Sequence, residues 1–293
     1  MDRILVVDDE PSIVNSARMI LEKEGYSVSS ASNGDEALRV FQTESPDLIL
    51  LDLVMPGKSG LEICKILKEQ PRTRSIPVVM FNTVGREVDR KLASWAGADG
   101  HFTKPFDKRQ LVEGVRGWLK EARASAFSRR LGITHDMLRG RKALLEVDPS
   151  SDYEKAVKDF VTESASHKMT VLAVTRTGSA VRQSLRNNEN AKLLILEVGV
   201  SFSRILSEYP NGDLSIVFDS LTDLSFMMEQ TGGPTHFIRF IENVLELLSD
   251  RRVTALFLLN AAALDSRTVA RIRGLFSNQF TYGPEGMAIV RQA

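Results

Sequence analysis

The sequence lacks the features that mark a secreted or membrane protein. Its single cysteine, Cys64, allows no disulfide bond within the chain, which fits a reducing compartment. No apolar run reaches the roughly 18 residues that a transmembrane helix needs. The N-terminal apolar run is too short for a signal peptide, and acidic residues follow it at once. We therefore expect a cytoplasmic protein that does not bind a membrane.

The chain also lacks an excess of either charge. Its 38 Lys and Arg residues balance 38 Asp and Glu residues, which argues against a broad surface for nucleic acid but leaves room for a local patch. With 43% apolar and 26% charged residues, the composition is that of a folded globular protein. A length of 293 residues is enough for two domains of ordinary size.

Apolar runs and segments with helical spacing alternate through the first 123 residues. The expected strands are residues 3–7, 26–31, 48–52, 76–81 and 99–103, and the expected helices are 11–23, 34–44, 60–69, 86–96 and 108–123. Five βα units with right-handed crossovers predict an α/β fold, in which helices cover both faces of a parallel sheet.

Charged side chains follow three of these strands, at the sheet edge where such folds bind ligands. Asp8 and Asp9 end the first strand, Asp52 ends the third, and Lys104 follows the fifth. Three carboxylates that lie close together should not all ionise without a cation, and Mg²⁺ prefers oxygen ligands. One carboxylate could then attack phosphorus, while the metal ion and the lysine neutralise the phosphoryl group.

Four motifs around these residues resemble those of the receiver domain of two-component response regulators. They are VVDDE at 6–10, the D-x-x-M-P-G-x-x-G run at 52–60, GAD at 97–99 and TKPF at 103–106. The resemblance covers residues 1–121 and implies a flavodoxin-like (βα)5 fold. It also implies phosphorylation by a sensor histidine kinase or a phosphotransfer protein.

The resemblance assigns a role to each site residue. Asp52 would accept the phosphoryl group, and Lys104 would contact its oxygens. Asp8 and Asp9, together with Asp52 and the main-chain carbonyl of Val54, would bind Mg²⁺. The Lys104–Pro105 peptide bond is expected to be cis.

Two positions depart from the pattern of that family. Where the family has Thr or Ser directly after the fourth strand, this chain has Asn82, followed by Thr83. Asn82 could donate to the phosphoryl group through its amide, whereas Thr83 could do so only if the loop shifts by one residue. His101 takes the place of the family's switch aromatic; it could rotate inward, respond to pH or simply face solvent at a strand edge.

A basic segment follows the last helix of this half. Residues 120–142 carry seven basic and two acidic residues. The first part of this segment can extend the last helix of the first half, which Gly132 would end, and Thr134 could cap a second short helix. We expect a solvated helical connector over residues 122–142. A patch for nucleic acid or for an acidic partner is the alternative, which the near absence of interleaved aromatic residues disfavours.

The alternation resumes after the connector and predicts a second α/β domain over residues 143–293. The expected strands are 142–147, 169–175, 192–198, 214–218 and 253–259, the helices are 153–164, 179–186, 235–248 and 266–276, and a hairpin turns at 283–286. Residues 148–293 carry 15 basic and 17 acidic residues, which disfavours a general role in DNA binding.

One strand of the second domain ends in an acid. The run LSIVFDSLTDL at 214–224 places Asp219 at that strand end and resembles the Walker B strand of RecA-like ATPases, particularly the branch with the circadian-clock ATPase. The strand at 169–176 would then lead into the phosphate loop. The residues there, Thr175 to Ala180, contain one glycine and no lysine instead of G-x-x-x-x-G-K-[ST]. The alternative is an unrelated doubly wound domain with a polar strand end.

These observations lead to one expected function and two alternatives. We expect a response regulator that is phosphorylated on Asp52 and acts on an unidentified downstream protein through a RecA-like domain without ATPase activity. In one alternative the second domain hydrolyses nucleotide through a divergent loop. In the other, the regulator binds DNA through the basic segment. A homodimer is compatible with each.

Overall fold

The computed structural model describes residues 1–82, 87–195, 206–209, 213–229, 233–249 and 252–292. Contacts within the chain divide it into two compact units, Met1–Arg123 and Ala124–Ala293. None of the helices in the described ranges is long and apolar enough to cross a membrane.

The first unit is a five-stranded parallel sheet with the expected alternation of strands and helices. Its strand order is β2-β1-β3-β4-β5, the order of flavodoxin-like sheets. The elements are β1 (Arg3–Val7), α1 (Pro11–Lys23), β2 (Ser27–Ala31), α2 (Gly34–Thr43), β3 (Leu48–Asp52), α3 (Gly60–Glu69), β4 (Val78–Asn82), α4 (Glu87–Trp95), β5 (Gly100–Thr103) and α5 (Lys108–Ala124). The flavodoxin-like expectation is therefore confirmed.

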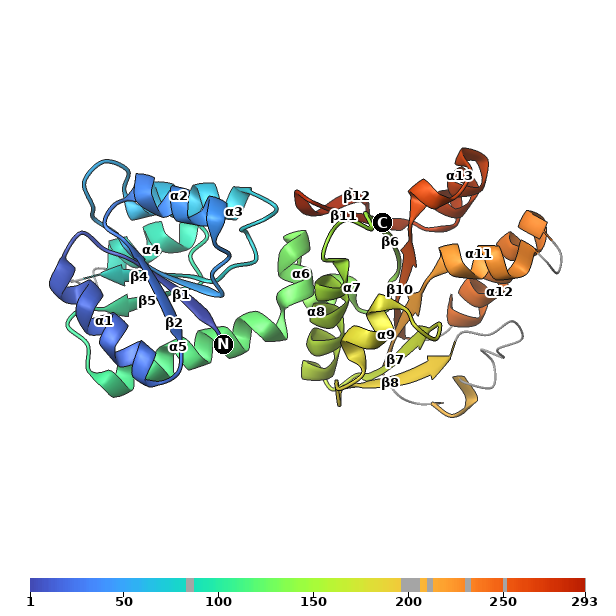
Figure 1. The fold of residues 1–293 in the computed structure, drawn as a ribbon, viewed down its shortest axis with the longest axis horizontal. Helices are drawn as coiled ribbons and strands as arrows, with labels where there is room; N and C mark the ends of the chain where they lie inside the picture. The colour runs from blue at the N-terminus through green and yellow to red at the C-terminus, as the bar shows by residue number, and fades with distance from the viewer. Residues whose placement is uncertain (83–86, 196–205, 210–212, 230–232, 250–251, 293) are drawn as a thin grey trace. The chain divides into compact units, whose positions relative to one another are not determined.

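Strand side chains alternate between two apolar layers in this unit. Ile4 and Val6 of β1 pack in a cluster with buried residues of α1 and α5, whereas Leu5 and Val7 pack in a second cluster with buried residues of α2, α3 and α4. Figure 1 shows α1 and α5 on one face of the sheet and α2 and α3 on the other. Because both faces are covered, only the sheet edge at the strand ends is left for polar side chains.

The second unit is built on a seven-stranded sheet in the order β12-β11-β6-β10-β9-β7-β8. All neighbouring strands are parallel except β12, which pairs antiparallel with β11 as the expected hairpin. The strands are β6 (Lys142–Val147), β7 (Thr170–Thr175), β8 (Ala191–Ile195), β9 (Leu214–Asp219), β10 (Val253–Leu259), β11 (Asn278–Gly283) and β12 (Gly286–Arg291). The helices are α6 (Ala126–Leu131), α7 (His135–Leu138), α8 (Tyr153–Ser166), α9 (Ala180–Leu185), α11 (Leu221–Glu229), α12 (Gly233–Ser249) and α13 (Ser266–Leu275), with a 3₁₀ turn at Ala261–Ala263.

The segment expected to be a solvated connector is instead part of the second unit. Phe127, Leu131 and Leu138 are buried in a core cluster of that unit. Phe127 packs edge-on against Phe160 of α8, with ring centroids 5.1 Å apart. The last helix of the first half does not extend to Gly132, because α5 ends at Ala124 and α6 is a separate helix. Gly132 ends α6 with φ +71°, and Thr134 precedes α7 but makes no side-chain capping bond.

Two further elements of the second unit compare with the expectations as follows. Helix α11 was not predicted, because Leu221, Leu224, Ser225 and Met228 are all buried and its sequence carries little amphipathic periodicity. The strand expected at 192–198 is described as β8, and its last three expected residues lie outside the described residues.

Candidate functional site

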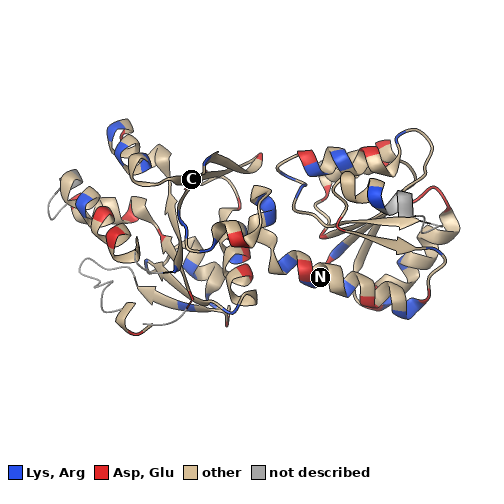
Figure 2. Ribbon diagram, turned by 180° about the vertical axis from the view of Figure 1, so that it is seen from behind, with Lys and Arg blue, Asp and Glu red and all other residues tan. Residues whose placement is uncertain are grey.

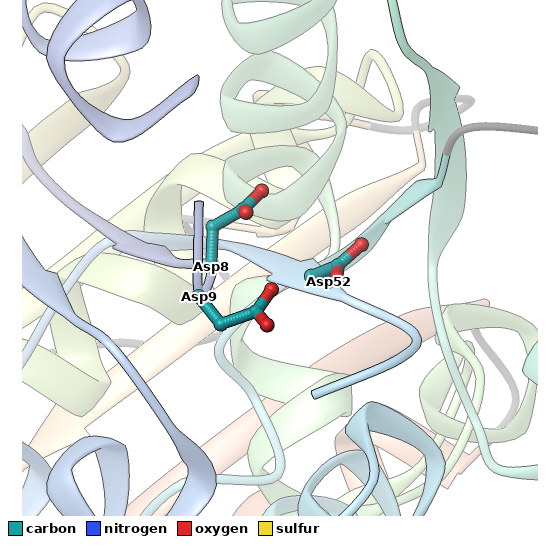
Figure 3. Close-up of side chains that lie close together, drawn as sticks. All are labelled: Asp8, Asp9 and Asp52. Atoms are coloured by element: carbon teal, nitrogen blue, oxygen red, sulfur yellow. The ribbon is translucent and has the colours of Figure 1, made fainter. Parts of the chain in front are cut away.

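The topology of the first sheet brings its strand-end acids together. Strands β1 and β3 are neighbours, with Val7 paired to Leu51, so Asp8 and Asp52 leave the sheet at the same edge. The strand order reverses between β1 and β3, which is where doubly wound sheets bind ligands. Carboxylate oxygens of Asp8, Asp9 and Asp52 all lie within 4.8 Å of one another. Figure 3 shows the three side chains grouped at this edge.

The three carboxylates differ in their access to solvent. Asp8 is 1% exposed and Asp52 is 7% exposed, whereas Asp9 is exposed. One oxygen of Asp8 accepts a hydrogen bond from the Glu10 amide at 3.0 Å. A hollow of about 250 Å³ opens beside Asp8 and Asp9, lined in part by Asn15. The cluster is therefore a buried pair of acids with one open side.

Lys104, which follows the edge strand β5, contacts two of these acids. Its Nζ donates to Asp52 Oδ1 at 2.9 Å and also forms an ion pair with Asp8, and the side chain is only 6% exposed. The Lys104 amide donates to the Asn82 carbonyl at 2.7 Å, so β4 holds its backbone. The Lys104–Pro105 peptide bond is cis, as the resemblance implies.

An aromatic residue that the sequence reasoning missed also contacts the lysine. Phe81 is fully buried and its ring centre lies 5.1 Å from Lys104 Nζ. Phe81 packs in turn against Phe106, with ring centroids 5.0 Å apart. The signal was present in the sequence, because Phe81 ends an apolar run and Phe106 belongs to the TKPF motif. The ammonium therefore has a fixed, largely apolar surrounding on one side.

Electrostatics at Asp52 reflect these neighbours. Burial raises the pKa of Asp52 above its usual value; the hydrogen bond and charge of Lys104 oppose that rise, and the charge of Asp8 adds to it. A single ammonium thus faces two buried carboxylates. An additional cation at the open side would favour ionised Asp52.

The donor set fits a hard divalent cation. Its three carboxylates offer only oxygen ligands, and the exposed Asp9 leaves room for water molecules, as Mg²⁺ requires. Val54, whose carbonyl is the expected fourth ligand, lies in the loop after β3 and is 74% exposed. Among the residues that the structure describes, this is the one acid, His or Cys group close enough to hold a metal ion.

The glycine that ends the D-x-x-M-P-G-x-x-G motif has a steric reason. A Cβ on Gly60 would lie 2.0 Å from the Asp52 carbonyl oxygen, so only glycine lets α3 begin this close to the strand end. The Gly60 amide donates to the Leu53 carbonyl at 3.1 Å and closes the loop. The motif therefore shapes the loop that carries Val54.

The two departures from the family pattern are placed as follows. Asn82 ends β4 beside Lys104 and is half-buried, whereas Thr83 lies outside the described residues. His101 lies in β5 and is exposed, which corresponds to the solvent-facing alternative rather than to an inward rotamer. Two of the residues expected to contact the phosphoryl group are thus in place. Lys104 contacts the acids, and Asn82 lies at the same end of the sheet.

Asp219 lies at the carboxyl end of β9 in the second unit and is 4% exposed. Burial raises its pKa to about 6; a hydrogen bond from Ser179 opposes the rise, and the charge of Asp223 adds to it. Its Oδ2 accepts no hydrogen bond within the described part of the chain. Arg176, in the loop after β7, pairs with Asp223 at 3.0 Å. Among the described residues no Lys or Arg forms an ion pair with Asp219, whereas Lys104 pairs with Asp52 in the first site.

The loop that would have to cradle phosphate is a short turn. Gly178 adopts φ +87°, and Ser179 caps α9 by accepting from the Arg182 amide at 3.0 Å. The helix that follows has only six residues. This turn offers few main-chain N–H groups to a triphosphate.

Comparison with known proteins identifies a receiver domain within the first unit. A family model described as the response regulator receiver domain matches residues 4–116. The alkaline phosphatase synthesis transcriptional regulatory protein PhoP of Bacillus subtilis is 37% identical over 154 residues, 53% of this chain and 62% of PhoP. The transcriptional regulatory protein ResD of the same organism is 41% identical over 125 residues, 43% of this chain and 51% of ResD. The chain spans about half the length of the curated relatives it matches.

Solved structures of response regulators also match part of this chain. The response regulator TrrA of Thermotoga maritima, in complex with Mg²⁺ and BeF, is 37% identical, with 40% of this chain and 99% of that chain covered and a TM-score of 0.37. The chemotaxis protein CheY4 of Vibrio cholerae is 30% identical, with 40% and 98% covered and a TM-score of 0.39.

Proposed function

Because residues 4–116 belong to the response regulator receiver domain family, we propose that this protein is a response regulator that is phosphorylated on Asp52. The observation that carries the proposal is the contact of Lys104 with both Asp52 and Asp8 at a strand-end acid cluster. A buried carboxylate beside a fixed ammonium can act as a nucleophile while the ammonium neutralises an incoming phosphoryl group. A sensor histidine kinase or a phosphotransfer protein would be the donor.

Each residue of the cluster has a defined part in this proposal. An oxygen of Asp52 attacks phosphorus, the N–P bond of the donor's phosphohistidine breaks, and an acyl phosphate forms on Asp52. Lys104 donates to the phosphoryl oxygens from Nζ, and Asn82 could add an amide donor. Asp8 and Asp9, with Asp52 and the carbonyl of Val54, would hold Mg²⁺, which supplies further neutralisation of the phosphoryl charge when bound.

The test is phosphorylation of the full chain by acetyl phosphate with Mg²⁺, followed by mass spectrometry. We expect the wild-type protein to gain one phosphoryl group and Asp52→Asn to gain none. Asp47→Asn, which changes an acid at the opposite end of the same strand region, is the matched control and should be phosphorylated normally. An Asp52→Asn protein that is modified at the wild-type rate would refute the assignment.

For the second unit we propose an interaction with a downstream protein rather than nucleotide hydrolysis. The turn at Gly178 and the missing lysine support this proposal, because a triphosphate needs both a cation and a row of main-chain donors. A pull-down that compares acetyl phosphate-treated protein with untreated protein and with Asp52→Asn tests it. Capture of the same partners in all three states would contradict control by phosphorylation.

DNA binding through the basic segment is the alternative that the names of the transcriptional relatives suggest. The ion pairs that arginines of this segment form with aspartates argue against it. Arg130 pairs with Asp159 at 2.6 Å, and Arg139 pairs with Asp213. Figure 2 shows acidic and basic residues interspersed along the helices of both units. A paired arginine offers less charge to phosphates, so we expect no steep salt dependence in a DNA titration of the protein.

A further inference from the structure

A hollow of about 640 Å³ lies beside α9 and β8 in the second unit. Its volume falls within the range that proteins use for small molecules, roughly 300–1,000 Å³. Thr177 and Gly178 of the turn after β7 line this hollow, whereas neither Asp52 nor Asp219 is among its described lining residues. Its lining residues in the described part of the chain are Thr177, Gly178, Arg182, Gln183, Arg186 and Leu193.

The hollow carries positive charge that the described residues do not neutralise. Arg182 and Arg186 are four positions apart and therefore lie on the same side of α9 and its C-cap. Neither forms an ion pair within the described ranges. Other arginines of this unit do pair with carboxylates, as Arg130, Arg139, Arg176 and Arg273 show.

Neutral acceptors hold the guanidinium of Arg182 in place. Its Nη1 donates to Thr175 Oγ1 at 3.2 Å and to the Leu194 carbonyl at 3.1 Å, and the residue is half-buried. These bonds use one of three guanidinium nitrogens, so the remaining N–H groups can meet a planar oxyanion. An oriented arginine without a carboxylate partner loses little freedom when it binds such a group.

The other walls suit a ligand with a small uncharged part. Gly178 has φ +87°, and a Cβ there would meet nothing within 4 Å, so the main chain is open to solvent at this turn. Gln183 Nε2 donates to the Gly178 carbonyl at 3.3 Å and steadies it. Leu193 is half-buried and gives the hollow one apolar surface.

We propose that the hollow between α9 and β8 binds a small anionic molecule whose phosphate or carboxylate group contacts Arg182 and Arg186. The rest of the ligand lies against Leu193. This site would give the second unit a small-molecule input that is independent of Asp52. The two arginines supply the charge, and the hydrogen bonds of Arg182 supply the orientation.

The test is an NMR titration of the full chain with sodium pyrophosphate and, separately, with sodium succinate. Mg²⁺ is omitted so that the acids of the first unit repel rather than attract the anions. We expect saturable shifts of the Gly178 and Arg182 amides. Arg182→Gln should weaken binding about tenfold or more, since hydrogen bonds to charged groups are among the stronger ones. The preferred anion distinguishes a phosphate from a carboxylate ligand.

Matched variants separate this site from general charge effects and from the proposed phosphorylation. Arg186→Gln changes an exposed residue that should not affect folding, and it should also weaken binding. Arg271→Gln removes an exposed arginine of α13 and should bind like the wild type, as should Asp52→Asn. Absence of shifts with both anions would overturn the proposal. Equal affinity of the wild type and the Arg182→Gln, Arg186→Gln double variant would overturn it as well.

Discussion

The two units place a buried aspartate at the carboxyl end of a parallel strand, but they surround it differently. Asp52 of the first unit contacts the ammonium of Lys104, whereas Asp219 of the second has an oxygen without a donor in the described structure. Burial raises the pKa of both acids, and for Asp219 it reaches about 6. The difference shows that a doubly wound sheet readily presents strand-end acids, while a neighbouring cation decides whether the charge of a buried acid is neutralised.

The largest expected effect comes from removing the cation of the first unit. Lys104→Met should lower the free energy of unfolding of this unit by about 3–5 kcal/mol at neutral pH, because it leaves Asp8 and Asp52 buried without their partner. Urea unfolding followed by tryptophan fluorescence measures it, since Trp95 and Trp118 both lie in the first unit and the chain has only two tryptophans.

Lys108→Met is the matched control for that experiment. Lys108 pairs with Glu24 at 2.8 Å, but its side chain is 60% exposed, so the loss should stay below about 1 kcal/mol. If the two lysine variants lose the same stability, Lys104 does not neutralise buried charge and the contrast between the units fails.

The second-largest expected effect is a gain in the free energy of unfolding, and it concerns the second unit. The pKa of Asp219 is raised from 3.8 to about 6 in the folded protein. The folded state therefore binds the proton more tightly, and stability is lost as the pH rises from about 4 through about 6. Asp219→Asn removes this loss and should stabilise the unit by up to about 3 kcal/mol at pH 7.5, but not at pH 4.

Hydrogen exchange measures that change in the second unit. The slowest amides of the fully buried strand β10 report the free energy of unfolding of the unit around them. They should exchange more slowly in Asp219→Asn than in the wild type at pH 7.5. If Asp219→Asn slows exchange by the same factor near pH 4 as at pH 7.5, the gain in stability does not come from a buried charge.

A smaller effect is expected from Mg²⁺. Weak binding to Asp8, Asp9 and Asp52 should stabilise the first unit by about 1.4 kcal/mol at a Mg²⁺ concentration tenfold above the dissociation constant. Tryptophan fluorescence in urea detects this change, and Asp9→Asn should abolish it. Protection of the β10 amides should not respond to Mg²⁺; a response would give Asp219 a metal site and remove the contrast.

The smallest expected effect is that of ATP on the second unit. Calorimetric titration of the full chain with ATP and Mg²⁺ should give no affinity tighter than about 1 mM, or about −4 kcal/mol. The reason is that the turn after β7 has no glycine-rich cradle, so the arginines near it, Arg176, Arg182 and Arg186, lack the row of main-chain donors that a triphosphate also needs. Micromolar binding that disappears in Asp219→Ala would instead support a nucleotide-hydrolysing output domain.

Local patterns in the sequence were sufficient for most elements and for the acids of the site. Strand β3 was expected at its observed bounds, because a continuous apolar run that ends in Asp52 is readable without knowledge of its neighbours. Helix α11 was missed since its buried residues leave little periodicity. The connector was misplaced because Phe127 finds its partner, Phe160, far along the chain.

The sequence by itself determined which residues end the strands and hence that Asp8, Asp9, Asp52 and Lys104 share one sheet edge, because strand periodicity and parallel crossovers are local properties. Only the tertiary structure decided which charges meet. It brings Lys104 to two acids, leaves His101 exposed and buries Asp219, which forms no ion pair within the described ranges. These outcomes depend on burial and on neighbours from distant parts of the chain, which set the electrostatic environment of each group.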